Sequence, residues 1–188
     1  MEEVGQEVKI VLFGDCQSGK TSMTVRFTND EFIENYRTVG LITHSRVIEL
    51  HGERKKLTVF ELAGQSGYKA LVKVYYKNAH VVLLVYNPLQ SSSLEHIPYY
   101  FKNGKQLCQN ALFVLVATHS DECGFSKEAG EQQAKELGIP FFATSAKTGE
   151  NIDKLFLYIA REYNTLTKLN PLPLEGWQTS RECYCAVS

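Results

Sequence analysis

Apolar residues in this chain fall into short, nearly continuous runs, and the segments between the runs have helical spacing. Runs of this kind, such as 8–13 and 79–86, are typical of strands buried on both faces of a parallel sheet. The alternation predicts an α/β domain in which helices cover a mainly parallel sheet and ligands bind at the carboxyl ends of the strands. The predicted strands are 8–13, 41–50, 56–62, 79–86, 111–118 and 140–143, and the predicted helices are 20–29, 66–77, 91–108, 126–137 and 151–163.

Two segments predict how particular strands and helices are arranged, beyond their positions along the chain. A turn at 51–54 predicts that strands 41–50 and 56–62 form an antiparallel hairpin. Pro98 cannot donate a backbone hydrogen bond, so it should start or kink the helix expected over 91–108. Segment 66–77 is weakly patterned and fits either a helix or a loop.

Composition narrows the class of protein. The chain has 188 residues, of which 44% are hydrophobic, and this suits one domain over 8–167 with an extension at 1–7 and a linker-like tail at 168–188. A net charge of −1 without a basic run argues against binding to nucleic acid. The first residues lack the apolar core of a signal peptide, and the five cysteines lack zinc-ligand spacing, so we expect a protein made in the cytosol without a disulfide framework.

The segment Gly14-Asp15-Cys16-Gln17-Ser18-Gly19-Lys20-Thr21 follows the first strand and leads into the first helix. Its pattern G-x-x-x-x-G-K-[ST] predicts a loop whose backbone N–H groups bind phosphate, with Lys20 adding charge and Thr21 a hydroxyl for Mg²⁺. An ordinary strand-to-helix turn that happens to contain lysine is the alternative. The residues predicted to bind phosphate here are Gly14, Gln17, Ser18, Gly19, Lys20, Thr21 and Ser22.

Further motifs follow in the order and spacing of a Ras-like small GTPase, which this chain resembles from Lys9 to Tyr163. Within that superfamily it is most similar to the Rab branch, through Tyr75-Tyr76-Lys77-Asn78-Ala79 and Leu84-Val85-Tyr86. The resemblance implies a three-layer P-loop fold with a mostly parallel six-stranded sheet, one antiparallel strand and helices on both faces. The motifs are the phosphate loop, Thr38-Val39-Gly40, Ala63-Gly64-Gln65, Asp121 and Thr144-Ser145-Ala146-Lys147.

The same resemblance implies a role for each of these residues. Thr38 joins Thr21 as a magnesium ligand, Gly64 donates to a γ-phosphate, and Gln65 orients the attacking water as the catalytic residue. Loops ordered by one phosphoryl group would make the protein a switch between GTP and GDP. On the base side, Asp121 would bind guanine, with Phe32 over the ring, Thr118 and His119 beside it, and the backbone of Ser145, Ala146 and Lys147 facing its carbonyl.

The chain departs from the family pattern at four points. Tyr36-Arg37-Thr38 is one residue shorter than the usual Rab loop, so the tyrosine and the threonine cannot both keep their familiar placement. Thr118-His119-Ser120-Asp121 keeps only the aspartate of Asn-Lys-x-Asp, so we expect weakened guanine affinity. Glu61 replaces an aspartate that holds Mg²⁺ through water, which predicts poorer metal binding and fast exchange. Gln17 lies inside the phosphate loop, where its side chain would crowd the phosphates or an arginine supplied by an activating partner, so we expect slow GTP hydrolysis. A pseudo-GTPase, a scaffold that binds nucleotide without meaningful turnover, is therefore the alternative, whereas a nucleotide kinase would need an arginine-rich lid that we do not find.

The chain ends Cys185-Ala186-Val187-Ser188, which fits the C-a-a-X prenylation pattern, and Cys183 offers a second lipid site. A single prenyl chain binds membranes only marginally, so attachment should need Cys183 or a protein partner. The expected protein is a monomer that binds effectors, exchange factors and GTPase-activating proteins through its switch loops. It should work at the cytoplasmic face of an endomembrane or the plasma membrane, with a cytosolic pool.

Overall fold

The computed structural model describes residues 6–34, 38–50, 52–63 and 69–169. Strands and helices alternate along most of this length, as the apolar runs predict. The strands are β1 Glu7–Phe13, β2 Leu41–Leu50, β3 Glu53–Leu62, β4 Val81–Tyr86, β5 Leu112–Ala117 and β6 Phe141–Ala143, and the helices are α1 Lys20–Asn29, α2 Lys69–Tyr75, α3 Ser91–Glu95, α4 Ile97–Leu107, α5 Glu128–Leu137 and α6 Ile152–Leu169.

All six strands join one sheet in the order β2-β3-β1-β4-β5-β6. The pair β2 and β3 is antiparallel and the other pairs are parallel, so the predicted mixed α/β fold is confirmed. The central strands read as continuous apolar runs because helices cover both of their faces. In β4 and β5, every residue except the half-buried Leu112 is buried.

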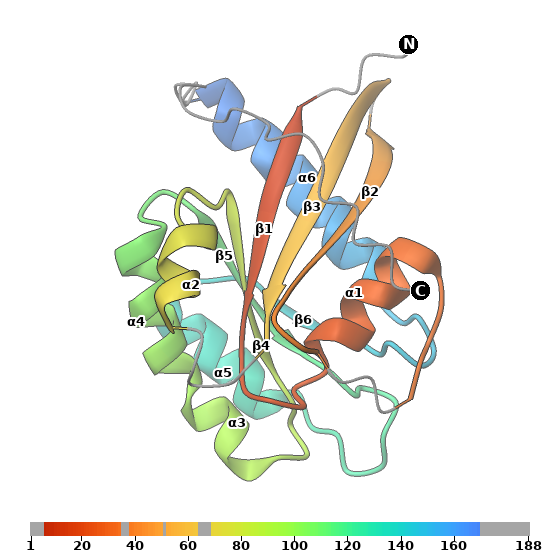
Figure 1. The fold of residues 1–188 in the computed structure, drawn as a ribbon. Helices are drawn as coiled ribbons and strands as arrows, with labels where there is room; N and C mark the ends of the chain where they lie inside the picture. The colour runs from red at the N-terminus through yellow and green to blue at the C-terminus, as the bar shows by residue number, and fades with distance from the viewer. Residues whose placement is uncertain (1–5, 35–37, 51, 64–68, 170–188) are drawn as a thin grey trace.

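Successive side chains of β1 enter two separate cores, one on each face of the sheet. Val8, Ile10 and Leu12 pack beneath α1 and α6, where the rings of Phe27 and Phe156 stack with centroids 3.7 Å apart. Val11 and Phe13 belong to the opposite core. Figure 1 shows α1 and α6 on one side of the sheet and α2, α3, α4 and α5 on the other. The fold is therefore three layers, as the resemblance implies.

The structure moves several boundaries of the predicted elements. Strand β3 begins at Glu53, three residues before the predicted start, because Glu53 pairs with Leu50 and the hairpin is tighter than the expected turn at 51–54. Helix α6 continues to Leu169, six residues beyond its predicted end. The helix expected over 91–108 is two helices, α3 and α4, with Pro98 in the first turn of α4. Pro98 thus starts a helix, one of the two outcomes expected from its missing N–H.

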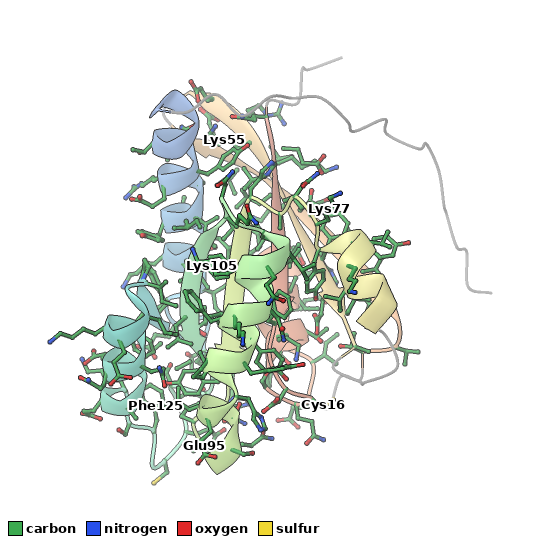
Figure 2. All side chains as sticks on the ribbon, turned by 90° about the vertical axis from the view of Figure 1, so that its left-hand side faces the viewer. Cys16, Lys55, Lys77, Glu95, Lys105 and Phe125 are labelled. Atoms are coloured by element: carbon green, nitrogen blue, oxygen red, sulfur yellow. The ribbon has the colours of Figure 1, made fainter. Side chains whose placement is uncertain are left out.

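The described loops that follow β1, β4 and β5 lie together at the carboxyl ends of these parallel strands. Figure 2 shows Cys16, Glu95 and Phe125, which follow β1, β4 and β5, at one end of the molecule, whereas Lys55 lies toward the other. Among the described residues, no helix combines the length and apolar character needed to cross a membrane.

Candidate nucleotide site

The loop between β1 and α1 is held close to its neighbours by two glycines. A Cβ on Gly14 would lie 2.1 Å from the carbonyl oxygen of Val85, so only glycine lets the loop approach β4 this closely. Gly19 has φ 81° and lies against Thr118, whose side-chain atoms a Cβ would meet at 3.1 Å. The turn therefore places the N-terminus of α1 directly beneath the loop after β5.

Gln17 is exposed and has φ 62°, a left-handed conformation that is costly for a residue with a Cβ. Its neighbour Ser18 is fully buried. The side chain of Gln17 is thus exposed on the phosphate loop, and its predicted effect on GTP hydrolysis stays a prediction.

Lys20 is the charged group of the loop, and it is only 5% exposed. Its Nζ donates to the carbonyl oxygens of Gly14 and Asp15 and lies 3.2 Å from Ser18 Oγ. Burial lowers the pKa of Lys20, whereas the nearby carboxylate of Glu61 opposes that shift. The ammonium group is thus fixed within the loop, where an anion would meet a desolvated positive charge.

Three oxygen-bearing side chains meet beside Lys20. Thr21 Oγ1 donates to Glu61 Oε1 at 2.6 Å, Thr38 Oγ1 lies 3.3 Å from the same oxygen, and the two threonine hydroxyls contact each other. Glu61 is 1% exposed, and its Oε2 has no partner among the described residues. Burial raises the pKa of Glu61, although both hydroxyls and Lys20 act in the opposite direction. Hydroxyl and carboxylate oxygens, one of them unpartnered, are the donors that Mg²⁺ prefers, so the cluster fits this ion.

A cleft of about 250 Å³ lies on the other side of the phosphate loop. Asp121 from the loop after β5 and Phe32 from the segment after α1 both line it, so the structure brings together residues that are far apart in the sequence. Ser22 reaches it from α1. The lining residues are Gly19, Ser22, Phe32, Ile33, Glu34, Thr118, His119, Asp121, Glu122, Ala146 and Lys147.

Thr118 ties the base side of the cleft to the phosphate loop. Its Oγ1 lies 2.9 Å from the carbonyl oxygen of Ser18 and 3.1 Å from that of Tyr86, and His119 Nδ1 is 2.8 Å away. The single hydroxyl proton is shared between two carbonyls, so the link to the loop is retained in a weaker form than a carboxamide would give. His119 itself has φ 58°.

Only two of residues 145–147 line the cleft. Ser145 is fully buried, its N–H donates to the carbonyl oxygen of Glu150, and its Oγ accepts from the N–H of Thr148. Ser145 therefore shapes the loop instead of presenting its N–H, which differs from the expectation. Ala146 and Lys147 line the cleft, and within the described part of the chain neither backbone N–H has a hydrogen-bond partner.

Sequence reasoning missed a second contact of the phosphate loop. Asp15 Oδ1 accepts a hydrogen bond of 2.6 Å from the Tyr100 hydroxyl, and Asp15 Oδ2 lies 2.8 Å from His96 Nδ1. These partners come from α4 and from the residue that joins α3 to α4. Only the motif position of Asp15 marks it in the sequence, and nothing there pairs it with residues more than 80 positions away.

Four predicted site residues lie outside the described residues. Gly64 and Gln65 belong to the segment after β3, and Cys183 and Cys185 belong to the C-terminal tail. Their predicted roles stay predictions.

Comparison with known proteins agrees with this geometry. The sequence model of the Ras family matches residues 9–165. Among curated proteins, the chain is 34% identical over 161 residues to the Ras-related protein RABE1e of Arabidopsis thaliana, with 82% of this chain and 74% of that protein covered. It is 32% identical to the GTP-binding protein ypt2 of Schizosaccharomyces pombe, covering 82% and 80%, and 33% identical to human Rab-26, covering 82% and 62%.

Proposed function

Because this chain belongs to the Ras family of small GTPases, we propose that it is a guanine-nucleotide switch of the Rab type, which binds GTP and GDP with Mg²⁺ and recruits effectors in vesicular traffic. One observation carries the proposal. Thr38, just before β2, contacts Thr21 at the start of α1 and Glu61 near the end of β3. A loop that reaches the metal-binding residues in this way can report which nucleotide is bound.

The phosphates would lie against the loop between β1 and α1. Lys20 would contact their oxygens, and Thr21, Thr38 and Glu61 would hold Mg²⁺, which supplies positive charge to the phosphate oxygens when bound. Glu61 would act through a water or directly. The proposed phosphate-binding residues are Gly14, Gln17, Ser18, Gly19, Lys20, Thr21, Ser22, Thr38 and Gly64.

The base would occupy the cleft lined by Asp121. A carboxylate accepts both the N1–H and the exocyclic amine of guanine, whereas adenine lacks that pair of donors. Phe32 would cover one face of the ring, with Thr118 and His119 at its edge, and the N–H groups of Ala146 and Lys147 would face the guanine carbonyl.

We propose slow GTP hydrolysis, with Gln65 orienting water and with Gln17 and Glu61 slowing turnover. A pseudo-GTPase scaffold is the second candidate, and the length of Glu61 favours it, because a carboxylate one methylene longer than the family's aspartate would impair catalysis more than occupancy. The active protein would be a monomer with its G domain at 8–167. Cys185, together with Cys183, would anchor it to the cytoplasmic face of a membrane.

The test is to identify the nucleotide bound to purified protein and to measure GDP, GTP and ATP affinities with and without Mg²⁺. We expect co-purifying guanine nucleotide, weak ATP binding and Mg²⁺-dependent retention. Asp121→Asn supplies the matched control. Its amide can donate to the carbonyl that xanthine carries in place of the guanine amine, so preference should move from GDP to xanthosine diphosphate. A protein that prefers ATP, or that binds none of these nucleotides, would contradict the proposal.

A further inference from the structure

Arg26 of α1 is bonded to the wall of the base cleft, although no motif marks it. Its Nε donates to the carbonyl oxygen of Ala146 at 2.6 Å, and its Nη2 donates to that of Lys147 at 3.0 Å. The remaining nitrogen, Nη1, donates to the backbone and carboxylate oxygens of Asp30, the residue that caps α1. The side chain is only 18% exposed. One planar guanidinium group therefore holds two successive carbonyls of the cleft wall to the helix that begins at the phosphate loop.

Fixing a carbonyl also fixes the N–H on the other side of the same peptide plane, because a trans peptide is planar and its C=O and N–H point in opposite directions. The peptide that joins Lys147 to Thr148 is held at both ends, by Arg26 and by Ser145 Oγ. The peptide that joins Ala146 to Lys147 is held by Arg26 at its carbonyl end only. Its N–H belongs to a residue that lines the cleft. A charge-assisted bond at the carbonyl also polarises the peptide and strengthens that N–H as a donor.

We propose that Arg26 is a positioning residue for base recognition, which aims the N–H of Lys147 at the carbonyl oxygen of the bound guanine. This inference rests on the proposed function, since it requires a guanine nucleotide in the cleft. Lysine could not replace Arg26, because an ammonium on a flexible stem cannot span both carbonyls and Asp30 in one fixed plane. Arg26 would thereby compensate in part for Thr118 and His119, which stand where the family pattern has asparagine and lysine.

Arg46 offers a matched control. Its Nη1 donates to the carbonyl oxygen of Phe27 at 2.7 Å and pairs with Asp153 at 3.2 Å, so it also ties α1 to its surroundings through a backbone carbonyl. Arg46 does not line the cleft. Arg26→Lys and Arg46→Lys therefore make the same chemical change at two arginines that each bond to a backbone carbonyl and to a carboxylate.

The experiment compares two ligands, GDP and 2-aminopurine riboside diphosphate, which lacks the carbonyl oxygen of guanine and also the N1–H that Asp121 would accept. Because the loss at Asp121 is the same in every variant, the change in the affinity ratio between variants reports on the carbonyl contact. Affinities of wild type, Arg26→Lys and Arg46→Lys are measured for both, with thermal midpoints as a check on folding. In Arg26→Lys, we expect the ratio of GDP affinity to analogue affinity to fall about tenfold, the scale of one hydrogen bond between an amide N–H and a carbonyl oxygen. In Arg46→Lys, the ratio should equal that of wild type.

Arg26→Gln gives the same comparison if Arg26→Lys does not fold, because glutamine can donate to one carbonyl but not to both. Equal affinity ratios in the Arg26 and Arg46 variants would overturn this inference alone. Failure of the wild-type protein to bind GDP would overturn the proposed function and this inference with it.

Discussion

Glu61 is the residue at which the proposed metal-binding cluster departs from the family pattern, which has aspartate there. Its buried carboxylate uses one oxygen on Thr21 and Thr38 and leaves the other without a partner among the described residues. Shortening the side chain by one methylene should let a water sit between carboxylate and ion, as small octahedral Mg²⁺ prefers.

Glu61→Asp should therefore bind Mg²⁺–GDP more tightly, with GDP dissociation slowed by about tenfold, the usual scale for a change in the groups around a metal. Release of a fluorescent GDP analogue measures the rate. Chelation with EDTA is the control, because without Mg²⁺ the two proteins should release nucleotide at similar rates. A Glu61→Asp protein that releases Mg²⁺–GDP as fast as wild type would contradict the argument.

Gln17 occupies a left-handed backbone conformation that glycine adopts without strain. Gln17→Gly should raise the free energy of unfolding by about 0.5–1 kcal/mol, since relief of the strain exceeds the entropy that glycine loses on folding. Urea unfolding measures the change. Gln132→Gly in the interior of α5 is the matched control and should destabilise by about 1 kcal/mol. Destabilisation by both changes would show that the Gln17 backbone is not strained.

Single residues also show where sequence reasoning stops. The motif predicts that Thr118 makes one hydroxyl bond where a carboxamide would make more, but it does not identify the partner. In the structure the hydroxyl reaches the carbonyl of Ser18, because Gly19 lets the two loops approach. Gly130 looks in the sequence like a weak point inside a helix. In the structure a Cβ there would lie 2.1 Å from the Tyr86 hydroxyl, so glycine is what lets α5 sit on the sheet. Contacts of this kind depend on packing between distant segments, which a local pattern does not contain.

The junction of α3 and α4 forms a second support for the phosphate loop. His96 and Tyr100 both bond to Asp15, which the sequence could not predict, although Pro98 does predict where α4 begins. Hydrogen bonding to Asp15 and its negative charge raise the pKa of His96 above its ordinary value of 6.5, and Glu95 adds to the shift. Burial and the bond to Asp15 raise the pKa of Tyr100, which stays protonated as a donor.

Because the pKa of His96 is raised, we can say in which direction the rate of GDP dissociation should change with pH. The attraction between His96 and Asp15 is fully present below pH 6.5 and is lost as the pH rises through the higher pKa of the folded state. GDP dissociation should then speed up about two- to threefold more in wild type than in His96→Asn between pH 6 and pH 8.5, a small effect because the pair is exposed and screened. High salt should reduce the difference. If the rates of GDP dissociation from wild type and His96→Asn change equally with pH, the contact between His96 and Asp15 does not stabilise the phosphate loop.

The elements themselves could be predicted much better than the contacts between them. Long apolar runs located β1, β4 and β5 to within two residues, because burial on both faces leaves a strong signal. The start of β3 was missed by three residues, since Glu53 and Arg54 are polar and pair only because the hairpin register places them opposite Leu50 and Glu49. Ala63 N–H also donates to the carbonyl of Gly40, a contact that joins the loops on either side of the hairpin and has no counterpart in the local pattern.

Across the whole molecule, the two halves of the sheet differ in burial. Strands β4 and β5 are buried at nearly every position, whereas β2 lies at the edge of the sheet and is largely exposed along its length. Thr38 and Glu61 connect the half that contains β2 and β3 to Thr21 of α1. Replacement of GDP by GTP should therefore alter the protection of backbone amides against hydrogen exchange near β2 and β3. The protection of amides in β4 and β5 should stay unchanged.

Amide hydrogen exchange tests this division directly. We compare the protein loaded with GDP and with a non-hydrolysable GTP analogue, and we expect slower exchange with the analogue at 38–41 and 61–63 and equal exchange at 112–117. Thr38→Ala is the control, because it keeps the nucleotide cleft but removes the hydroxyl that joins the loop to Thr21, so its two profiles should converge. If both nucleotides bind wild type but give identical hydrogen-exchange profiles, the result would favour the scaffold over the switch. A scaffold that signals by occupancy needs no structural difference between the GTP-bound and GDP-bound states.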